Sequence, residues 1–378
     1  MGDFWLVGGA APRSHCTSRR SGFKRVLGQG HVCGFLGIVV RPIGWRQAAS
    51  SSATGPARST VVDPAIRHVS DTAWWVASFR AEEGQRADAA FTDPLASLLS
   101  GDRGRAIARS IPRAAMVEWG MIIRTSAIDR LINEALIAGV DTVLNLGAGL
   151  DTRPYRMKLP ASLRWVELDF PNIVELKDST LAEYRPVCKL ERVGIDLLDR
   201  PSRNKILARY GTTSKNTLVI TEGVLSYFSI HDAATLASEL HATPSIRFWI
   251  QDFDNAGKRR LPRGWGAKLK AAPFLFQVKD WFEFFEKYGW RSSQVITSFE
   301  ESQRINRPYP LDFPFGLILR AIPKTMSQKI LSLSGAVLMQ RAATPSGKPL
   351  NRSENLSATS PSFTHSRANA ARAPISIT

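Results

Sequence analysis

The stretch Val143-Leu144-Asn145-Leu146-Gly147-Ala148-Gly149-Leu150-Asp151-Thr152-Arg153-Pro154 decides the fold class of this 378-residue chain. An apolar strand runs into two glycines, which permit a tight turn and let a ligand approach the backbone closely. Thr152 and Pro154 predict the N-cap and the first turn of the next helix. A dinucleotide-binding loop needs a third glycine where Thr152 stands, and Asp151 would put a negative charge beside a pyrophosphate. The loop therefore suits an adenosine ligand without phosphates better than NAD.

On both sides of this stretch, β-rich runs alternate with helical ones. The predicted strands are residues 142–146, 164–168, 190–195, 217–221, 246–251 and 335–341. Such alternation predicts a parallel sheet with helices on both faces. Apolar residues between 127 and 136 recur at helical spacing, with Gly139 in the place of a C-cap. Residues 72–83 and 94–99 predict two further helices that form an N-terminal cap, and residues 278–288 predict another helix.

Polar side chains follow the predicted strands. Glu167 and Asp169 end the second strand, about 20 residues after the glycines, where doubly wound folds bind a ribose, and either acid fits that role. Asp196 and Leu197 follow the third strand, where an acid can accept from an adenine amino group and a leucine can pack on the ring. Glu222 directly follows the fourth strand. Because parallel strands end at one edge of a sheet, we expect a single ligand site there.

Taken together, these motifs resemble the S-adenosylmethionine-dependent methyltransferases of the leucine carboxyl methyltransferase family. The resemblance runs from about Asp71 to about Arg341 and rests on NLGAGLDTR at 145–153, ELDFP at 167–171, DL at 196–197 and TEGVLSY at 221–227. It implies a class I methyltransferase fold, which is an α/β, Rossmann-like doubly wound sheet with an N-terminal helical cap. The sheet would have seven strands, the last of them antiparallel. The resemblance also implies S-adenosyl-L-methionine as the cofactor.

The resemblance assigns roles to residues of the glycine loop and of the next strand ends. Gly147, with Gly149 in the same loop, would lie against the methionyl part of the cofactor. Asp169 would hold the ribose, and Asp196 and Leu197 would frame the adenine.

Three further cofactor residues are implied by the same resemblance. Glu222 would lie beside the cofactor near its methyl group, and Arg124 matches an arginine that pairs with the cofactor's carboxylate. A guanidinium group can bind such a carboxylate in a bidentate manner. Arg80 matches the basic residue of the N-terminal cap. Metal-binding motifs are absent from the sequence, so we expect no metal.

The methyl acceptor is less defined by the sequence. The resemblance implies O-methylation of a carboxyl or hydroxyl group on a small metabolite, with methylation of a protein's C-terminal leucine, the activity of the family's eukaryotic branch, as the alternative. A carboxylate acceptor needs no general base, whereas a hydroxyl acceptor does. Tyr227, Glu222 and His231 are the candidates for that base.

The charge of the chain suggests a different class of function. There are 50 Lys and Arg against 33 Asp and Glu, a net charge of +17, which raises the hypothesis of a nucleic-acid-binding protein. The basic run at 258–263 points the same way. However, residues 1–60 carry +7 and residues 341–378 carry +4, which leaves only +6 for the segment that holds every cofactor motif. We therefore expect no specific nucleic-acid partner.

Composition also predicts how the chain is organised. Residues 1–60 are rich in Arg and Ser and poor in acids, which fits either a disordered basic extension or an organellar targeting segment. Residues 61–343 form the predicted enzyme domain, and residues 344–378 a disordered tail. The 3 cysteines lack the spacing of a disulfide framework, which favours a reducing compartment such as the cytoplasm. The longest apolar runs are too short for a membrane span.

Overall fold

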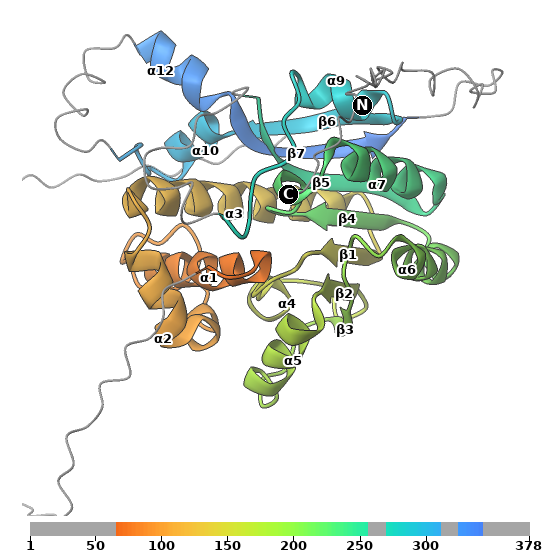
Figure 1. Cartoon of the computed structure of the whole chain (residues 1–378), viewed down its shortest axis with the longest axis horizontal. Coiled ribbons are helices and arrows are strands. Elements are labelled where there is room, and N and C mark those ends of the chain that lie inside the picture. Colours follow the sequence, from red (N-terminus) through yellow and green to blue (C-terminus); the bar gives the residue numbers. More distant parts are fainter. Residues whose placement is uncertain (1–65, 256–269, 311–323, 343–378) are drawn as a thin grey trace, which may run out of the picture. The chain divides into compact units, whose positions relative to one another are not determined.

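The computed structural model describes residues 66–255, 270–310 and 324–342. In these residues seven strands form one sheet in the order β3-β2-β1-β4-β5-β7-β6, which Figure 1 shows as a stack with β6 and β3 at its edges. The strands are β1 (Thr142–Leu146), β2 (Arg164–Asp169), β3 (Lys189–Gly194), β4 (Thr217–Thr221), β5 (Ile246–Asp254), β6 (Trp290–Thr297) and β7 (Ser334–Arg341). The first five are mutually parallel, and β7 runs antiparallel to β5 and β6. The predicted class I methyltransferase fold is confirmed.

Helices cover both faces of this sheet because its central strands are apolar on both sides. All five residues of β1 and all five of β4 are buried. Leu144 and Leu146 pack into a core with α6 (Arg200–Thr213), α7 (Ile230–Ala242) and α9 (Trp281–Glu286). Val143 points the other way and packs with α3 (Ala114–Ile137). Strands buried on both faces are typical of a parallel sheet inside a doubly wound fold.

The predicted N-terminal cap consists of a short 3-10 turn and two helices. The turn η1 (Val69–Asp71) leads into α1 (Thr72–Glu83), which has the predicted bounds, and α1 packs against α2 (Ala96–Arg109). The second helix is longer than predicted. Gly101 lies inside it with φ +52 and kinks it, and this glycine hides the helical pattern that continues beyond residue 99. The remaining elements are α4 (Arg153–Arg156), α5 (Pro171–Thr180), η2 (Leu225–Tyr227), α10 (Ser298–Arg304) and α12 (Lys324–Leu331).

Two local features differ from what the sequence predicts. No strand is predicted at β6, because Arg291 and its polar neighbours interrupt any apolar alternation. β6 is an edge strand with half of its residues exposed and an irregular register against β7. Thr152 does precede helix α4 as predicted, but its hydroxyl makes no capping hydrogen bond. It donates instead to Asp93 at 2.6 Å. The predicted extension at 1–60, the tail at 344–378 and the basic run at 258–263 lie outside the described residues.

Candidate active site

A cavity of about 400 Å³ lies at the carboxyl ends of strands β1 to β5 and is also lined by η1, α1 and residues 271–275. Its volume is within the range of small-molecule sites. Every residue predicted to bind the cofactor lines this cavity, and so does Tyr227. The predicted members of the lining are Arg80, Arg124, Gly147, Gly149, Asp169, Asp196, Leu197, Glu222 and Tyr227. Strand ends far apart in the sequence thus meet as the parallel topology requires.

The glycine loop is shaped by two left-handed residues. Gly147 has φ +66 and Gly149 has φ +48, conformations that other residues adopt only with strain. A Cβ atom at Gly147 would lie 2.4 Å from Cγ2 of Val224, so the position admits no side chain in this packing. The Gly147 N–H donates to the carbonyl of Leu168 at 2.7 Å, and the Gly149 N–H donates to Oδ2 of Asp169 at 2.6 Å. The loop is therefore fastened to the end of β2.

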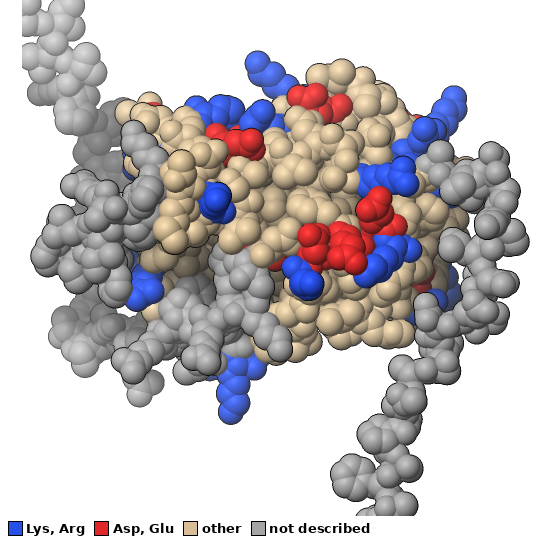
Figure 2. Space-filling view, turned by 90° about the horizontal axis from the view of Figure 1, so that it is seen from above, with Lys and Arg blue, Asp and Glu red and all other residues tan. Residues whose placement is uncertain are grey.

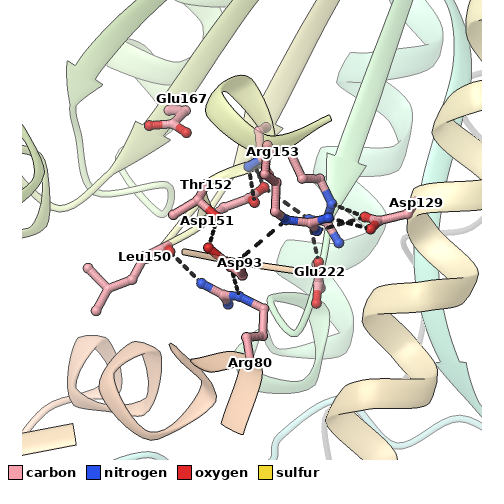
Figure 3. Close-up of polar contacts among 12 residues, drawn as sticks. Arg80, Asp93, Asp129, Leu150, Asp151, Thr152, Arg153, Glu167 and Glu222 are labelled. Atoms are coloured by element: carbon pink, nitrogen blue, oxygen red, sulfur yellow. Dashed lines mark hydrogen bonds and ion pairs between the residues drawn. The ribbon is translucent and has the colours of Figure 1, made fainter. Parts of the chain in front are cut away.

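The structure separates the two acids at the end of β2. Asp169 lines the cavity, whereas Glu167 is buried away from it and forms ion pairs with Lys177 at 2.7 Å and Arg192 at 2.8 Å. Figure 3 shows Glu167 apart from the residues around Arg153. Burial raises the pKa of Asp169, although the N–H groups of Gly149 and Phe170 oppose that shift. Of the two acids, Asp169 is the one that faces the space for a ligand.

The end of β3 supplies an apolar wall with one carboxyl group. Leu197 is buried and Asp196 accepts a hydrogen bond from the N–H of Leu198 at 2.9 Å. The N–H of Ile195 donates to the carbonyl of Asp169 at 2.7 Å, which holds this segment against β2. Both predicted adenine residues therefore lie next to the predicted ribose residue.

A network of buried charges connects the glycine loop with the end of β4 (Figure 3). Arg153 donates to Asp129 at 2.6 Å, to Asp151 at 2.9 Å and to Glu222 at 2.8 Å. Glu222 also accepts from Nε of Arg124 at 3.0 Å. Burial alone would raise the pKa of Glu222, but Arg153 and Arg124 together hold it below its ordinary value. Glu222 is thus a firmly ionised group, and the arginines fix its direction.

Asp252 is a lining residue that the sequence analysis misses. It lies near the end of β5, and its Oδ1 accepts from the N–H of Gly223 at 2.8 Å while Oδ2 accepts from Nη1 of Arg124 at 3.3 Å. Burial raises the pKa of Asp252 despite the nearby Arg124. The signal that identifies Glu222 also fits here, because Asp252 directly follows the run predicted as a strand, which ends at Gln251.

The two predicted cofactor arginines are both held by protein groups. Arg80 donates to Asp93 at 2.9 Å and to the carbonyl of Leu150 at 2.5 Å, which joins α1 to the glycine loop. Arg124 is shared between Glu222 and Asp252. Both side chains line the cavity. Their contacts with a cofactor stay predictions.

The three candidates for a general base have different environments. His231 is exposed on α7 and is not among the residues that line the cavity, so the structure does not bring this candidate to the site. Glu222 is engaged by two arginines. Tyr227 lines the cavity with its ring centroid 5.5 Å from that of Phe274, and burial raises its pKa. A tyrosine with a raised pKa stays protonated near neutral pH and is a poor base there.

The cavity has the opposite charge balance to the whole chain. Its described lining holds five carboxyl groups, Asp151, Asp169, Asp196, Glu222 and Asp252, against the three guanidinium groups of Arg80, Arg124 and Arg153. This excess favours a ligand that carries positive charge. On the face shown in Figure 2, basic and acidic side chains are interspersed.

Two further findings concern other kinds of site. Among the described residues, no three His, Cys, Asp or Glu side chains are grouped so that they would hold a metal ion. The helices of the described segments are too short or too polar to cross a bilayer.

Comparisons with known proteins agree with these observations. A family model described as "Leucine carboxyl methyltransferase" matches residues 73–241. A protein of Streptomyces coelicolor is 35% identical over 167 residues, which are 41% of this chain and 58% of that protein, less than two thirds of its length. A protein of Saccharopolyspora erythraea is 30% identical over 248 residues, 60% of this chain and 84% of that protein. Both carry the name "Putative S-adenosyl-L-methionine-dependent methyltransferase". A crystal structure of a "duf574 family protein" from Streptomyces avermitilis is 16% identical, with 70% of this chain and 96% of that protein covered, and has a TM-score of 0.43.

Proposed function

Since the chain belongs to the leucine carboxyl methyltransferase family of S-adenosylmethionine-dependent enzymes, we propose that it transfers the methyl group of S-adenosyl-L-methionine to an oxygen atom of a small molecule. One observation supports this above all: the ends of β1 to β4 bring Gly147, Asp169, Asp196 and Glu222 to one cavity, in the order that the family pattern implies. When bound, the cofactor supplies an electrophilic methyl group on a positively charged sulfur.

The residues of the lining fit such a cofactor. The glycines carry no side chain, so a ligand can approach the backbone of the loop closely. The excess of carboxyl groups suits a molecule that carries a sulfonium and an ammonium group against one carboxylate. Asp169 would accept hydrogen bonds from the ribose hydroxyls. Asp196 and Leu197 would hold the adenine, and Arg124 would meet the carboxylate.

The remaining lining would position the acceptor and exclude water. Trp75, Val76 and Met121 come from helices α1 and α3, and Phe274 and Leu275 come from the segment after β5. This segment is held in place by the N–H of Leu275, which donates to the carbonyl of Ser226 at 2.8 Å. Methyl transfer is an in-line displacement, so most of the catalysis lies in bringing the two reactants together in a dry site.

Calorimetry on the full chain tests the proposed cofactor. We expect S-adenosyl-L-methionine to bind to the wild type and to His231→Ala, whose side chain is exposed and outside the cavity, and binding to be lost in Gly147→Arg. Binding of NAD in place of S-adenosyl-L-methionine would overturn the proposal. Transfer of label from radiolabelled cofactor is then measured with small hydroxyl and carboxyl compounds and with a peptide that ends in leucine. The acceptor that takes up the label distinguishes small-molecule methylation from protein methylation.

A further inference from the structure

The order of strands along the sheet indicates which strand end lies next to the predicted cofactor residues. The predicted cofactor residues occupy successive strand ends, from Asp196 after β3 through Asp169 and Gly147 to Glu222 after β4. The next strand in the sheet is β5, and Asp252 near its end lines the same cavity. Asp252 is therefore the carboxyl group one strand beyond the predicted cofactor residues.

The hydrogen bonds of Asp252 leave room for another donor. An ionised carboxyl group has about four lone-pair positions. The Gly223 N–H occupies one at 2.8 Å and Arg124 occupies one at 3.3 Å. The side chain is 21% exposed, compared with 13% for Glu222, whose two oxygens each accept from a guanidinium group at 3.0 Å or less. Asp252 is thus the more accessible of the two and the less tightly paired.

The surroundings of Asp252 favour a particular kind of acceptor. Apolar and aromatic side chains from α1, α3 and the segment after β5 line the same cavity as Asp252, among them Trp75, Met121 and Phe274. A carboxylate acceptor placed here would face the like charges of Glu222 and Asp252. A neutral hydroxyl group would instead donate a hydrogen bond to Asp252.

We propose that the acceptor is an uncharged hydroxyl compound with an apolar body, such as a phenol, and that Asp252 accepts the hydroxyl proton during methyl transfer. This inference rests on the proposed methyltransferase function. The acceptor oxygen forms a bond to the methyl carbon with one of its lone pairs, and the C–S bond breaks with its electrons left on sulfur. The hydroxyl proton moves to an oxygen of Asp252. The products are a methyl ether, S-adenosylhomocysteine and a protonated carboxyl group, which returns its proton to water.

The electrostatics of the site agree with this role. Burial raises the pKa of Asp252, the nearby Glu222 adds to that shift, and Arg124 and the Gly223 N–H oppose it. Tyr227 also lines the cavity, and its raised pKa keeps it protonated near neutral pH. A carboxyl group whose pKa is raised binds a proton more readily, which is what a general base for a hydroxyl group requires.

The test uses Asp252→Asn in the full chain and a series of ring-substituted phenols, some ionised and some neutral at the assay pH. Formation of S-adenosylhomocysteine is the readout. We expect the variant to lose roughly 100-fold or more in kcat with neutral phenols. Phenols that are already ionised should lose much less, because they have no proton to give up. The Kd for S-adenosyl-L-methionine, measured by calorimetry, should change only a few-fold.

Glu222→Gln is the matched control, because it removes the other carboxyl partner of Arg124. It should weaken cofactor binding and slow every phenol by the same factor. An equal loss across the phenol series in Asp252→Asn would show that Asp252 acts only through Arg124 and would overturn the proposal. Preferred methylation of benzoic acids, or transfer to none of the phenols by a chain that binds the cofactor, would also overturn it. A chain that does not bind the cofactor fails the proposed function itself.

Discussion

Replacing Gly147 by alanine adds one methyl group at the tightest point of the glycine loop. The residue has φ +66, and a left-handed conformation costs an L-residue about 1–2 kcal/mol. The added Cβ atom would also lie 2.4 Å from Cγ2 of Val224. Val224 is 8% exposed and β-branched, so its side chain has few ways to move. Overpacking of this kind costs about 1–3 kcal/mol. We therefore expect Gly147→Ala to lower the free energy of unfolding by roughly 2–5 kcal/mol.

A double-mutant cycle separates the two contributions. Val224→Ala removes the methyl group that the new Cβ atom would meet, so the double variant should recover the overpacking part and keep the backbone strain. Equilibrium unfolding in urea of the wild type, both single variants and the double variant gives the interaction energy. We expect about 1–3 kcal/mol in favour of the double variant.

The cycle can refute this reasoning in two ways. Additive effects within about 0.5 kcal/mol would mean that Val224 does not press on the loop. A cost below about 1 kcal/mol for Gly147→Ala alone would mean that the left-handed conformation is not maintained.

Three further predictions concern the buried charges. Arg153→Met leaves three carboxyl groups without their shared partner and should lower the free energy of unfolding in urea by about 3–5 kcal/mol. Lys287→Met breaks an ion pair of two exposed side chains and should lower it by less than about 1 kcal/mol. Similar losses in the two variants would show that burial does not set the strength of these ion pairs. Burial alone would raise the pKa of Asp151, but Arg153 and its basic neighbours hold it well below its ordinary value. A carboxyl group with a lowered pKa stabilises the fold at pH values above its ordinary pKa of 3.8, and this contribution is lost as the pH falls towards the pKa in the folded state. The difference in free energy of unfolding between wild type and Asp151→Asn should therefore be constant near neutral pH and shrink below about pH 4. A difference that grows in acid would contradict this prediction. Asp169→Ala should weaken cofactor affinity roughly 10- to 100-fold by calorimetry, and unchanged affinity would exclude the ribose contact.

Much of the candidate site is predictable from the sequence because parallel strands end at one edge. An apolar strand followed by a glycine or an acid marks a position on that edge, whatever lies between the strands in the chain. Gly147, Asp196 and Glu222 fit this rule and line the cavity. The rule leaves Glu167 and Asp169 open, and the resemblance selects Asp169, which is the one that lines the cavity. Asp252 follows the same rule, but it is not predicted, because the motifs that carry the resemblance do not include β5.

The contacts that these side chains make within the protein are not predictable from local sequence patterns. The partners of Arg124 lie 98 and 128 residues along the chain, and a local pattern contains no information about them. Thr152 shows how such a partner overrides a local preference: a residue type suited to capping a helix donates instead to Asp93, 59 residues away. Strand β6 also depends on a distant partner, because this edge strand is stabilised by its pairing with β7 rather than by an apolar pattern of its own.

The charge of the chain and the charge of the cavity lead to opposite expectations about its ligand, and distance decides between them. Exposed charges more than about 8–10 Å from a site are largely screened at physiological salt, so the net charge of a whole chain is a poor guide to the potential inside a cavity. The lining acts at contact distance and with less solvent, and there carboxyl groups outnumber guanidinium groups. A chain of net charge +17 can therefore have a cavity whose lining suits a cationic ligand. Net charge describes how a protein meets large partners from a distance, and it does not describe the molecule that enters its cavity.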